Sequence, residues 1–191
     1  MISLESQQTH INQLIERCRK NDNSAQMQVY QSYYKAMYNT SYRILKDEFE
    51  AEDLIQEAFL TAFMKLDSFK GEVTFGAWLK RIVINKSLTQ LKKVTRYDEV
   101  RMDVIPSYEV EDIEIDYSSL EVKRVINCLQ SLKDNYRIVL TLNLIEGYDY
   151  DEIAQILNYT NENVRTTVSR AKKKLKQVLA ANTNKTQIYG G

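Results

Sequence analysis

The clearest structural signals in the second half of the chain lie in residues 147–179, GYDYDEIAQILNYTNENVRTTVSRAKKKLKQVL. Gly147 suits the left-handed residue that ends one helix. Asp149, with Glu152 three positions later, has the pattern of a capping box that starts the next helix. These signals predict a short helix over 150–157.

A second, longer helix is predicted directly after the first. Residues 158–160 form a short turn in which Thr160 is the next N-cap, and the longer helix covers 161–180. A short helix, a three-residue turn and a basic helix are typical of a helix-turn-helix. Two further helices, over 118–131 and 134–146, complete the predicted module.

The predicted helix over 161–180 separates into an apolar stripe and polar faces. The stripe that holds it to the module consists of Val164, Val168, Ala171 and Leu175. The polar residues that we expect to enter a DNA major groove are Arg165, Thr166, Thr167, Ser169, Arg170 and Lys173. A major groove admits one helix, and these side chains can bond to phosphates and base edges. A generic helical hairpin is the alternative.

Charge is segregated along the chain although the formal net charge is zero. Residues 80–96 carry six basic side chains and no acid, and residues 161–176 carry six basic side chains and one acid. Between them, residues 98–116 carry eight acids and one basic residue. One basic run alone is explained as a solvated helix face, but two such runs favour nucleic acid.

The acidic stretch marks a domain boundary, because self-repulsion and the helix-breaking ring of Pro106 both oppose a packed helix. We therefore expect an all-α protein of two small helical domains joined by an acidic flexible linker. The expected domains cover 11–96 and 118–180, the linker covers 97–117, and a frayed polar tail covers 181–191.

The first module shows two amphipathic helices, over 25–46 and 49–66. The first has an aromatic stripe that favours core packing over a ligand cage: Tyr30, Tyr34, Met37, Tyr38, Tyr42 and Leu45. The second turns inward Leu54, Ala58, Phe59, Ala62, Phe63 and Leu66. Its opposite side carries Glu50, Glu52, Asp53, Gln56 and Glu57. This acidic face suits a basic protein partner, although solvation and favourable carboxylates near the helix start explain it equally well.

A third helix of this module is predicted from an N-cap at Thr74 to the basic pair Lys92 and Lys93. Its apolar face is wide, so we expect Trp78 to be buried. Its polar side presents Lys80, Arg81, Asn85, Lys86 and Gln90. Cations seek phosphates and amides bond to base edges, so this side also suits nucleic acid.

Composition argues against an enzyme. Five glycines and one proline fit a nearly all-helical chain. The single histidine, His10, has no cluster of metal ligands around it, and no Gly-rich phosphate loop is present. Cys18 and Cys128 are expected to be buried free thiols. We expect no cofactor, metal or small-molecule substrate, and the absence of a signal-peptide pattern or a long apolar run predicts a cytoplasmic protein.

Two ordered sets of motifs resemble a known family. AEDLIQEAF at 51–59, FKG at 69–71 and FGAWLKRIVIN at 75–85 look like region 2 of bacterial sigma factors. EIAQIL at 152–157 and the basic segment that follows it look like region 4. With a short linker and no third domain between them, the chain resembles the extracytoplasmic-function group of the sigma-70 family.

The resemblance implies a promoter-recognition subunit that directs RNA polymerase to start sites and opens the −10 strand, without catalytic activity of its own. Core RNA polymerase would dock on Asp53, Gln56 and Glu57. The non-template strand of the −10 element would contact Lys80, Arg81, Asn85 and Lys86. The −35 duplex would be read by Arg165, Thr166, Ser169, Arg170 and Lys173.

Further partners follow from the same resemblance. Members of this family are commonly held inactive by an anti-sigma factor, and the acidic linker would thread a basic channel of the polymerase. The sequence departs from the family pattern at Glu162-Asn163 and at Thr167. The alternative is a conventional helix-turn-helix regulator whose N-terminal module senses or dimerises, and an enzyme with an appended DNA-binding module has little support.

Overall fold

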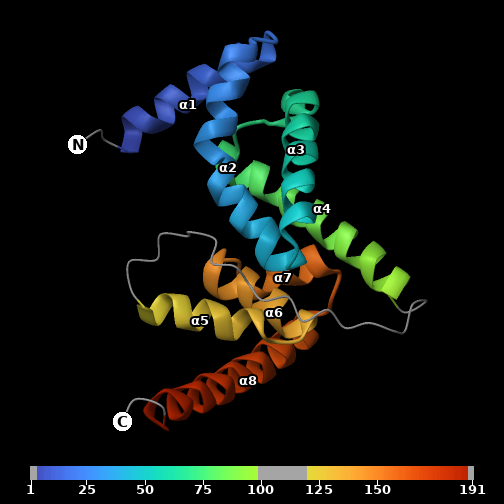
Figure 1. The fold of residues 1–191 in the computed structure, drawn as a ribbon. Coiled ribbons are helices and arrows are strands. Elements are labelled where there is room, and N and C mark those ends of the chain that lie inside the picture. Colours follow the sequence, from blue (N-terminus) through green and yellow to red (C-terminus); the bar gives the residue numbers. More distant parts are fainter. Residues whose placement is uncertain (1–3, 99–119, 189–191) are drawn as a thin grey trace. The chain divides into compact units, whose positions relative to one another are not determined.

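Each half of the chain folds into its own helical unit (Figure 1). The computed structural model describes residues 4–98 and 120–188. The two units divide near Val94. Within the described residues every regular element is helical, which confirms the predicted all-α class.

The first unit is built from α-helices and one 3-10 turn. They are α1 (Leu4–Arg19), α2 (Asn23–Leu45), α3 (Glu48–Met64), η1 (Leu66–Ser68) and α4 (Phe75–Asp98). Figure 1 shows α2 and α3 side by side, with α4 crossing next to them. The three predicted helices of this module are confirmed, although α4 runs on to Asp98. Helix α1 was not expected.

Short polar side chains start the helices of the first unit. The Asp22 carboxylate accepts from the backbone N–H groups of Ser24 at 2.9 Å and Ala25 at 3.1 Å. The Asp47 carboxylate accepts from the N–H of Glu50 at 2.9 Å. Thr74, the predicted N-cap of α4, accepts from the N–H of Ala77 at 3.3 Å. Each cap satisfies a donor that the first helical turn leaves unpaired.

The core of the first unit is assembled from every one of its α-helices. Its buried side chains include Leu14 and Ile15 from α1, Val29 and Met37 from α2, Ile55 and Phe59 from α3, and Phe75, Leu79 and Val83 from α4. Trp78 is half-buried rather than buried, because it lies at the edge of this core. Its ring centroid is 5.4 Å from that of Phe69 and 5.6 Å from that of Phe75.

The aromatic stripe of α2 packs structurally, as the sequence predicts. Met37 is buried, Tyr30, Tyr34 and Tyr38 are half-buried against the core, and Tyr42 is also half-buried. Tyr34 and Tyr38 stack with ring centroids 5.9 Å apart, and Tyr38 and Tyr42 continue the ladder at 6.2 Å. Burial and the neighbouring Glu48 raise the pKa of the Tyr38 hydroxyl to about 12. The ring therefore stays neutral at physiological pH.

The second unit begins with helices that match the prediction only in part. It contains α5 (Leu120–Gln130), α6 (Asp134–Leu140), the π-helical turn η2 (Thr141–Ile145), α7 (Tyr150–Leu157) and α8 (Asn161–Ile188). A single helix was predicted over 134–146. The π turn appears there because the N–H of Glu146 bonds to the carbonyl of Thr141 at 3.0 Å. Gly147, at a φ of 79°, then ends the helix in the predicted left-handed conformation.

The prediction of a frayed tail after residue 180 is wrong as far as Ile188, because α8 continues to that residue. Side chains of α5 help to hold the extension. Arg124 donates to the carbonyl of Leu179 at 2.9 Å, and the amide of Asn182 donates to Sγ of Cys128 at 3.2 Å. These partners lie more than fifty residues earlier in the sequence, so local composition could not reveal them.

Both cysteines are buried free thiols, as predicted. Burial is the main cause that raises the pKa of the Cys18 thiol. The predicted linker lies outside the described residues from residue 99 onward, Pro106 included. The expected domain limits therefore stay a prediction.

Candidate nucleic-acid and protein interfaces

Helices α7 and α8 form a helix-turn-helix whose bends are set by polar caps. The capping box is complete: the N–H of Glu152 donates to the Asp149 carboxylate at 2.8 Å, and the N–H of Asp149 donates to the Glu152 carboxylate at 2.9 Å. Asn158 ends α7 in the left-handed conformation at a φ of 56°. Thr160 accepts from the N–H of Asn163 at 3.2 Å and starts α8. The capping box, the short turn over 158–160 and the N-cap at Thr160 are thus confirmed, and the left-handed conformation of Asn158 is an added finding.

The faces of α8 separate as predicted. Val164, Val168, Ala171 and Leu175 are buried in the second unit. The exposed residues of the predicted set are Arg165, Thr166, Ser169, Arg170 and Lys173. Thr167 is half-buried, and its hydroxyl donates to the side-chain oxygen of Asn163 at 3.1 Å. Thr167 is therefore less available to DNA than the other members of the set.

A shallow groove of about 470 Å³ lies beside the start of α8. Its lining residues are Asn143, Asp149, Tyr150, Asp151, Arg165 and Lys172. Lys172 is a cation that the sequence analysis left out of the DNA-binding set, although it lies in the same basic run. The two aspartates at the start of α7 place negative charge close to Arg165, which lowers the local positive potential.

The predicted polymerase-binding residues share the outer part of α3. Asp53, Gln56 and Glu57 are all exposed. Three large apolar side chains on the same helix are also exposed: Phe49 at 83%, Leu60 at 64% and Met64 at 79%. Positions 49, 53, 56, 60 and 64 fall on one face at helical spacing. The apolar members of this face were not predicted from the sequence, although their positions in line with the acidic residues are a signal for them.

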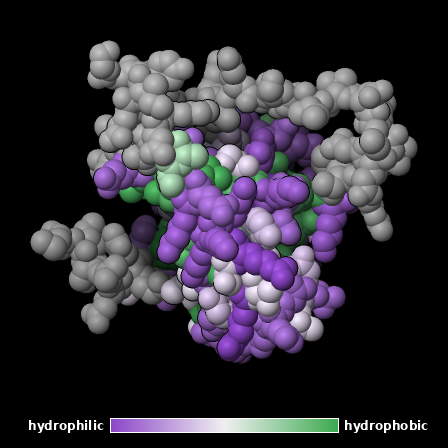
Figure 2. Space-filling view, turned by 90° about the horizontal axis from the view of Figure 1, so that it is seen from below, coloured by the Kyte–Doolittle hydropathy of each residue, from purple (hydrophilic) through white to green (hydrophobic). Residues whose placement is uncertain are grey.

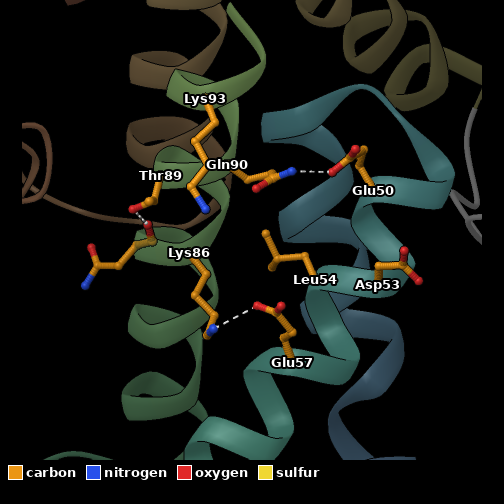
Figure 3. Close-up of a pocket in the computed structure, with 9 residues that line it drawn as sticks. Glu50, Asp53, Leu54, Glu57, Lys86, Thr89, Gln90 and Lys93 are labelled. Carbon is orange, nitrogen blue, oxygen red and sulfur yellow. Dashed lines mark hydrogen bonds and ion pairs between the residues drawn. The ribbon is translucent and has the colours of Figure 1, made fainter. Parts of the chain in front are cut away.

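A groove of about 460 Å³ separates α3 from α4 (Figure 3). Glu50, Asp53, Leu54 and Glu57 line it from α3, and Asn85, Lys86, Thr89, Gln90 and Lys93 line it from α4. The ammonium of Lys86 lies 3.0 Å from Oε2 of Glu57. The amide of Gln90 donates to Oε2 of Glu50 at 2.7 Å. In Figure 3, Asp53 points away from α4.

The structure therefore brings together Glu57 and Lys86, for which different partners are predicted from the sequence. On the remainder of the predicted −10 surface, Arg81 and Asn85 are exposed, while Lys80 is half-buried. The −35 set belongs to the other unit. Each cationic surface is thus complete within its own unit.

Where its atoms are described, the surface drawn in Figure 2 is mostly hydrophilic, with hydrophobic side chains in small areas between hydrophilic ones. Within the described residues no cluster of metal-ligating side chains occurs. None of the described helices is long and apolar enough to cross a membrane.

The fold and these surfaces define a class: two-module helical proteins with a C-terminal helix-turn-helix and a second cationic helix in the N-terminal module. Two family models match the chain, sigma-70 region 2 over residues 29–97 and sigma-70 region 4 over residues 123–175. The chain belongs to the sigma-70 family of RNA polymerase sigma factors, in the extracytoplasmic-function (ECF) group.

Named relatives agree with this assignment over most of their length. The ECF RNA polymerase sigma factor SigW of Bacillus subtilis is 29% identical over 186 residues, which cover 88% of this chain and 96% of SigW. The ECF sigma-E factor of Escherichia coli is 28% identical over 170 residues, with 83% and 88% covered.

Two solved structures share the fold. One is the sigma factor RpoE in complex with the anti-sigma factor NepR, from Bartonella quintana, with a TM-score of 0.63, 25% identity, and 81% of this chain and 96% of RpoE covered. The other is CnrH in complex with the cytosolic domain of CnrY, with a TM-score of 0.55, 25% identity, and 88% and 96% covered.

Proposed function

We propose that this chain binds core RNA polymerase through α3, holds the separated non-template strand with α4, and reads the −35 duplex with α8. The observation that carries this proposal is the presence of a cationic helix surface in each of two modules whose order matches sigma regions 2 and 4. Two DNA elements at a distance require two readers, and the polymerase fixes the spacing between them. The predicted domains, 11–96 and 118–180, are the units that act in this way.

Helix α8 suits duplex recognition because its apolar stripe is buried and its polar side is free. Arg165, Arg170 and Lys173 supply positive charge for phosphates and guanine edges. Thr166 and Ser169 add short hydrogen-bonding groups. The half-buried Thr167 supports the helix start and contributes less to contact with bases.

Helix α4 suits a single strand. Arg81 and Asn85 are exposed, and Asn85 lines the groove beside α3. Separating a base pair costs a few kcal/mol, and an amide that bonds to the exposed base edge recovers part of that cost. Lys80 and Lys86 add charge for the strand's phosphates.

The outer face of α3 suits a protein partner better than DNA. Its carboxylates Asp53 and Glu57 repel phosphates and attract basic side chains. The exposed side chains of Phe49, Leu60 and Met64 add apolar surface, whose contact with water is unfavourable. An acidic centre with apolar flanks is the expected chemistry for docking on a basic helical surface of the polymerase.

The proposed role needs no catalysis by the chain itself, because the polymerase forms the phosphodiester bonds. It places the protein in the cytoplasm, where the polymerase and the promoter are. The solved relatives RpoE and CnrH were captured with NepR and CnrY, so we include a protein inhibitor of the anti-sigma kind among the partners of this chain.

Run-off transcription with purified core polymerase tests the proposal. We expect start-site-specific transcripts from a genomic promoter set when the chain is added, and weak binding to duplex promoter by the chain alone. Tight binding of an operator by the free chain, with no transcripts, would instead identify a conventional helix-turn-helix regulator.

The Arg170→Ala variant tests the −35 surface. We expect weaker promoter binding by the holoenzyme and a salt dependence reduced by about one unit of log–log slope if Arg170 contacts a phosphate. Lys176→Ala is the control, because it removes an exposed charge from α8 outside the proposed set. Equal effects of the two substitutions would mean that α8 acts only through its total charge.

A further inference from the structure

Two side-chain contacts cross the groove between α3 and α4, and one of them joins full charges (Figure 3). Lys86 and Glu57 form an ion pair at 3.0 Å. Gln90 and Glu50 form a hydrogen bond at 2.7 Å, in which the donor is a neutral amide. The first contact is therefore the one that changes the charge that α4 presents to a ligand.

The two residues of the ion pair belong to two different proposed binding surfaces. Glu57 belongs to the proposed polymerase-binding surface, and Lys86 belongs to the proposed −10 surface. A carboxylate 3.0 Å from the ammonium cancels much of the attraction that Lys86 would exert on a phosphate. Each group is less available to its external partner as long as the pair stays closed.

The two side chains of the pair differ in exposure, so an external partner reaches one of them more easily than the other. The Glu57 side chain is 72% exposed, whereas that of Lys86 is 29% exposed. A basic protein surface can therefore reach the carboxylate directly. The ammonium, in contrast, is held against α3 and must move outward to meet a strand that lies on α4.

On the basis of the function proposed above, we propose that Glu57 is a positioning residue for Lys86. In the free chain Glu57 holds the ammonium in the α3–α4 groove and weakens its contact with DNA. When core polymerase binds Glu57, the ammonium is released to the non-template strand. Because coupling between two binding events is reciprocal, a bound strand also frees Glu57 for the polymerase.

The size of the effect follows from the exposure of the pair. Solvent-exposed ion pairs contribute little free energy in water. Opening this pair therefore corresponds to a change of about 1.5- to 5-fold in the affinity of the chain for a DNA strand. Such a factor tunes a partner-dependent DNA contact and does not act as an all-or-none switch. It is large enough to measure by titration.

Binding of a fluorescein-labelled oligo(dT) strand to the free chain tests the pair, with anisotropy as the readout. We expect Glu57→Gln to bind the strand about 1.5- to 5-fold more tightly than the wild type, because Lys86 loses its competitor. Glu52→Gln is the matched control. It removes the same charge from α3, but Glu52 accepts a hydrogen bond from Tyr34 at 3.3 Å and does not line the groove. Equal gains in both variants would overturn the proposal.

A double-mutant cycle identifies the group through which Glu57 acts. In the Lys86→Gln background, Glu57→Gln should no longer tighten binding of the oligo(dT) strand. A gain that persists in this background would show that Glu57 acts through overall charge, and the positioning role would be rejected. Circular dichroism of each variant checks that it folds, so a loss of structure is distinguished from a change in strand binding.

The same titration with saturating core polymerase tests the release. The gain from Glu57→Gln should vanish in the holoenzyme, since Glu57 is already occupied there. A gain of equal size in the holoenzyme would overturn the release step. Binding of the wild-type chain to core polymerase is measured separately by co-sedimentation. If the wild-type chain does not bind core polymerase, the proposed function is rejected. The double-mutant cycle on the free chain still decides whether the ion pair restrains Lys86.

Discussion

At the residue scale, the start of α2 depends on one carboxylate. The backbone N–H of Ala25, and then the guanidinium of Arg17, hold the pKa of the Asp22 carboxyl below its ordinary value. Arg17 reaches this carboxylate at 2.8 Å. A carboxyl with a lowered pKa in the folded state stabilises the protein above its unfolded-state pKa, and this stability is lost as the pH falls through the folded-state pKa.

We therefore expect the Asp22→Asn variant to melt at a lower temperature than the wild type at neutral pH. Asparagine is also a good N-cap, so the variant loses mainly the charge. The difference in Tm should shrink to zero as the pH falls below the ordinary range of an aspartate. Thermal melts across the acid range measure this. A difference that stays constant with pH would contradict the role of the charge, and Glu72→Gln serves as an exposed acidic control.

In the second unit, a buried arginine is matched to a half-exposed aspartate. Arg137 is 1% exposed, and its Nη2 lies 2.6 Å from the Asp134 carboxylate. Burial lowers the pKa of the guanidinium, and Asp134 counteracts that effect. Asp134→Asn keeps the shape of the side chain but removes the charge, and we expect a loss of about 1–3 kcal/mol in the free energy of unfolding.

Urea unfolding followed by circular dichroism measures this loss. The sequence contains a single tryptophan, Trp78, which lies in the first unit. Its fluorescence transition should stay unchanged in Asp134→Asn, because each unit buries its own core. Glu162→Gln, at an exposed acid in the first turn of α8, should cost less. A shift of the Trp78 transition would show that the two units do not unfold independently.

At the scale of elements, the capping box of Asp149 and Glu152 fixes where α7 begins. Asp149→Ala removes the carboxylate that accepts from the backbone N–H of Glu152, and should cost about 1 kcal/mol in the stability of the second unit. Glu152→Gln retains an acceptor at the same position and is the control. Urea titration compares the two. Equal losses would mean that charge near the helix start, rather than the box, is the stabilising feature.

Helix α3 has three sides with different surroundings. Its inner side packs Ile55 and Phe59 into the core, its edge contacts α4 through Glu57, and its outer face carries Asp53 with the exposed Phe49. We therefore expect a substitution on the outer face to weaken the proposed docking without opening the core. A substitution at Glu57 should also disturb the contact with α4, so we expect Glu57 and Asp53 not to be equivalent.

At the scale of the whole molecule, the predicted acidic linker is the remaining element to test. It lies outside the described residues from residue 99 onward, and residues 98–116 carry eight acids and one basic residue. Its negative charge would repel DNA and suit a basic channel in the polymerase. Replacing the acids of residues 98–116 with amides should lower polymerase affinity and initiation in run-off assays. Aspartate–glutamate exchanges at the same positions keep the charge and are the control, and unchanged initiation in the amide variant would reject the role.

The sequence alone determined the helical class, the two modules and the helix-turn-helix. These features depend on signals within a few residues of one another, such as the Asp149–Glu152 box, the Asn158 turn and the apolar stripe of α8. Local periodicity and capping act through the nearest turns of the backbone, so they can be read in order along the chain.

Which surfaces meet depends on how distant helices pack together. The Glu57–Lys86 pair joins positions 29 residues apart, and the contacts that hold the α8 extension join positions more than fifty apart. The half-burial of Trp78 and Lys80 likewise depends on what other helices cover. Such contacts result from packing of distant segments, whose free energy is set by the helices together and by no single stretch of sequence.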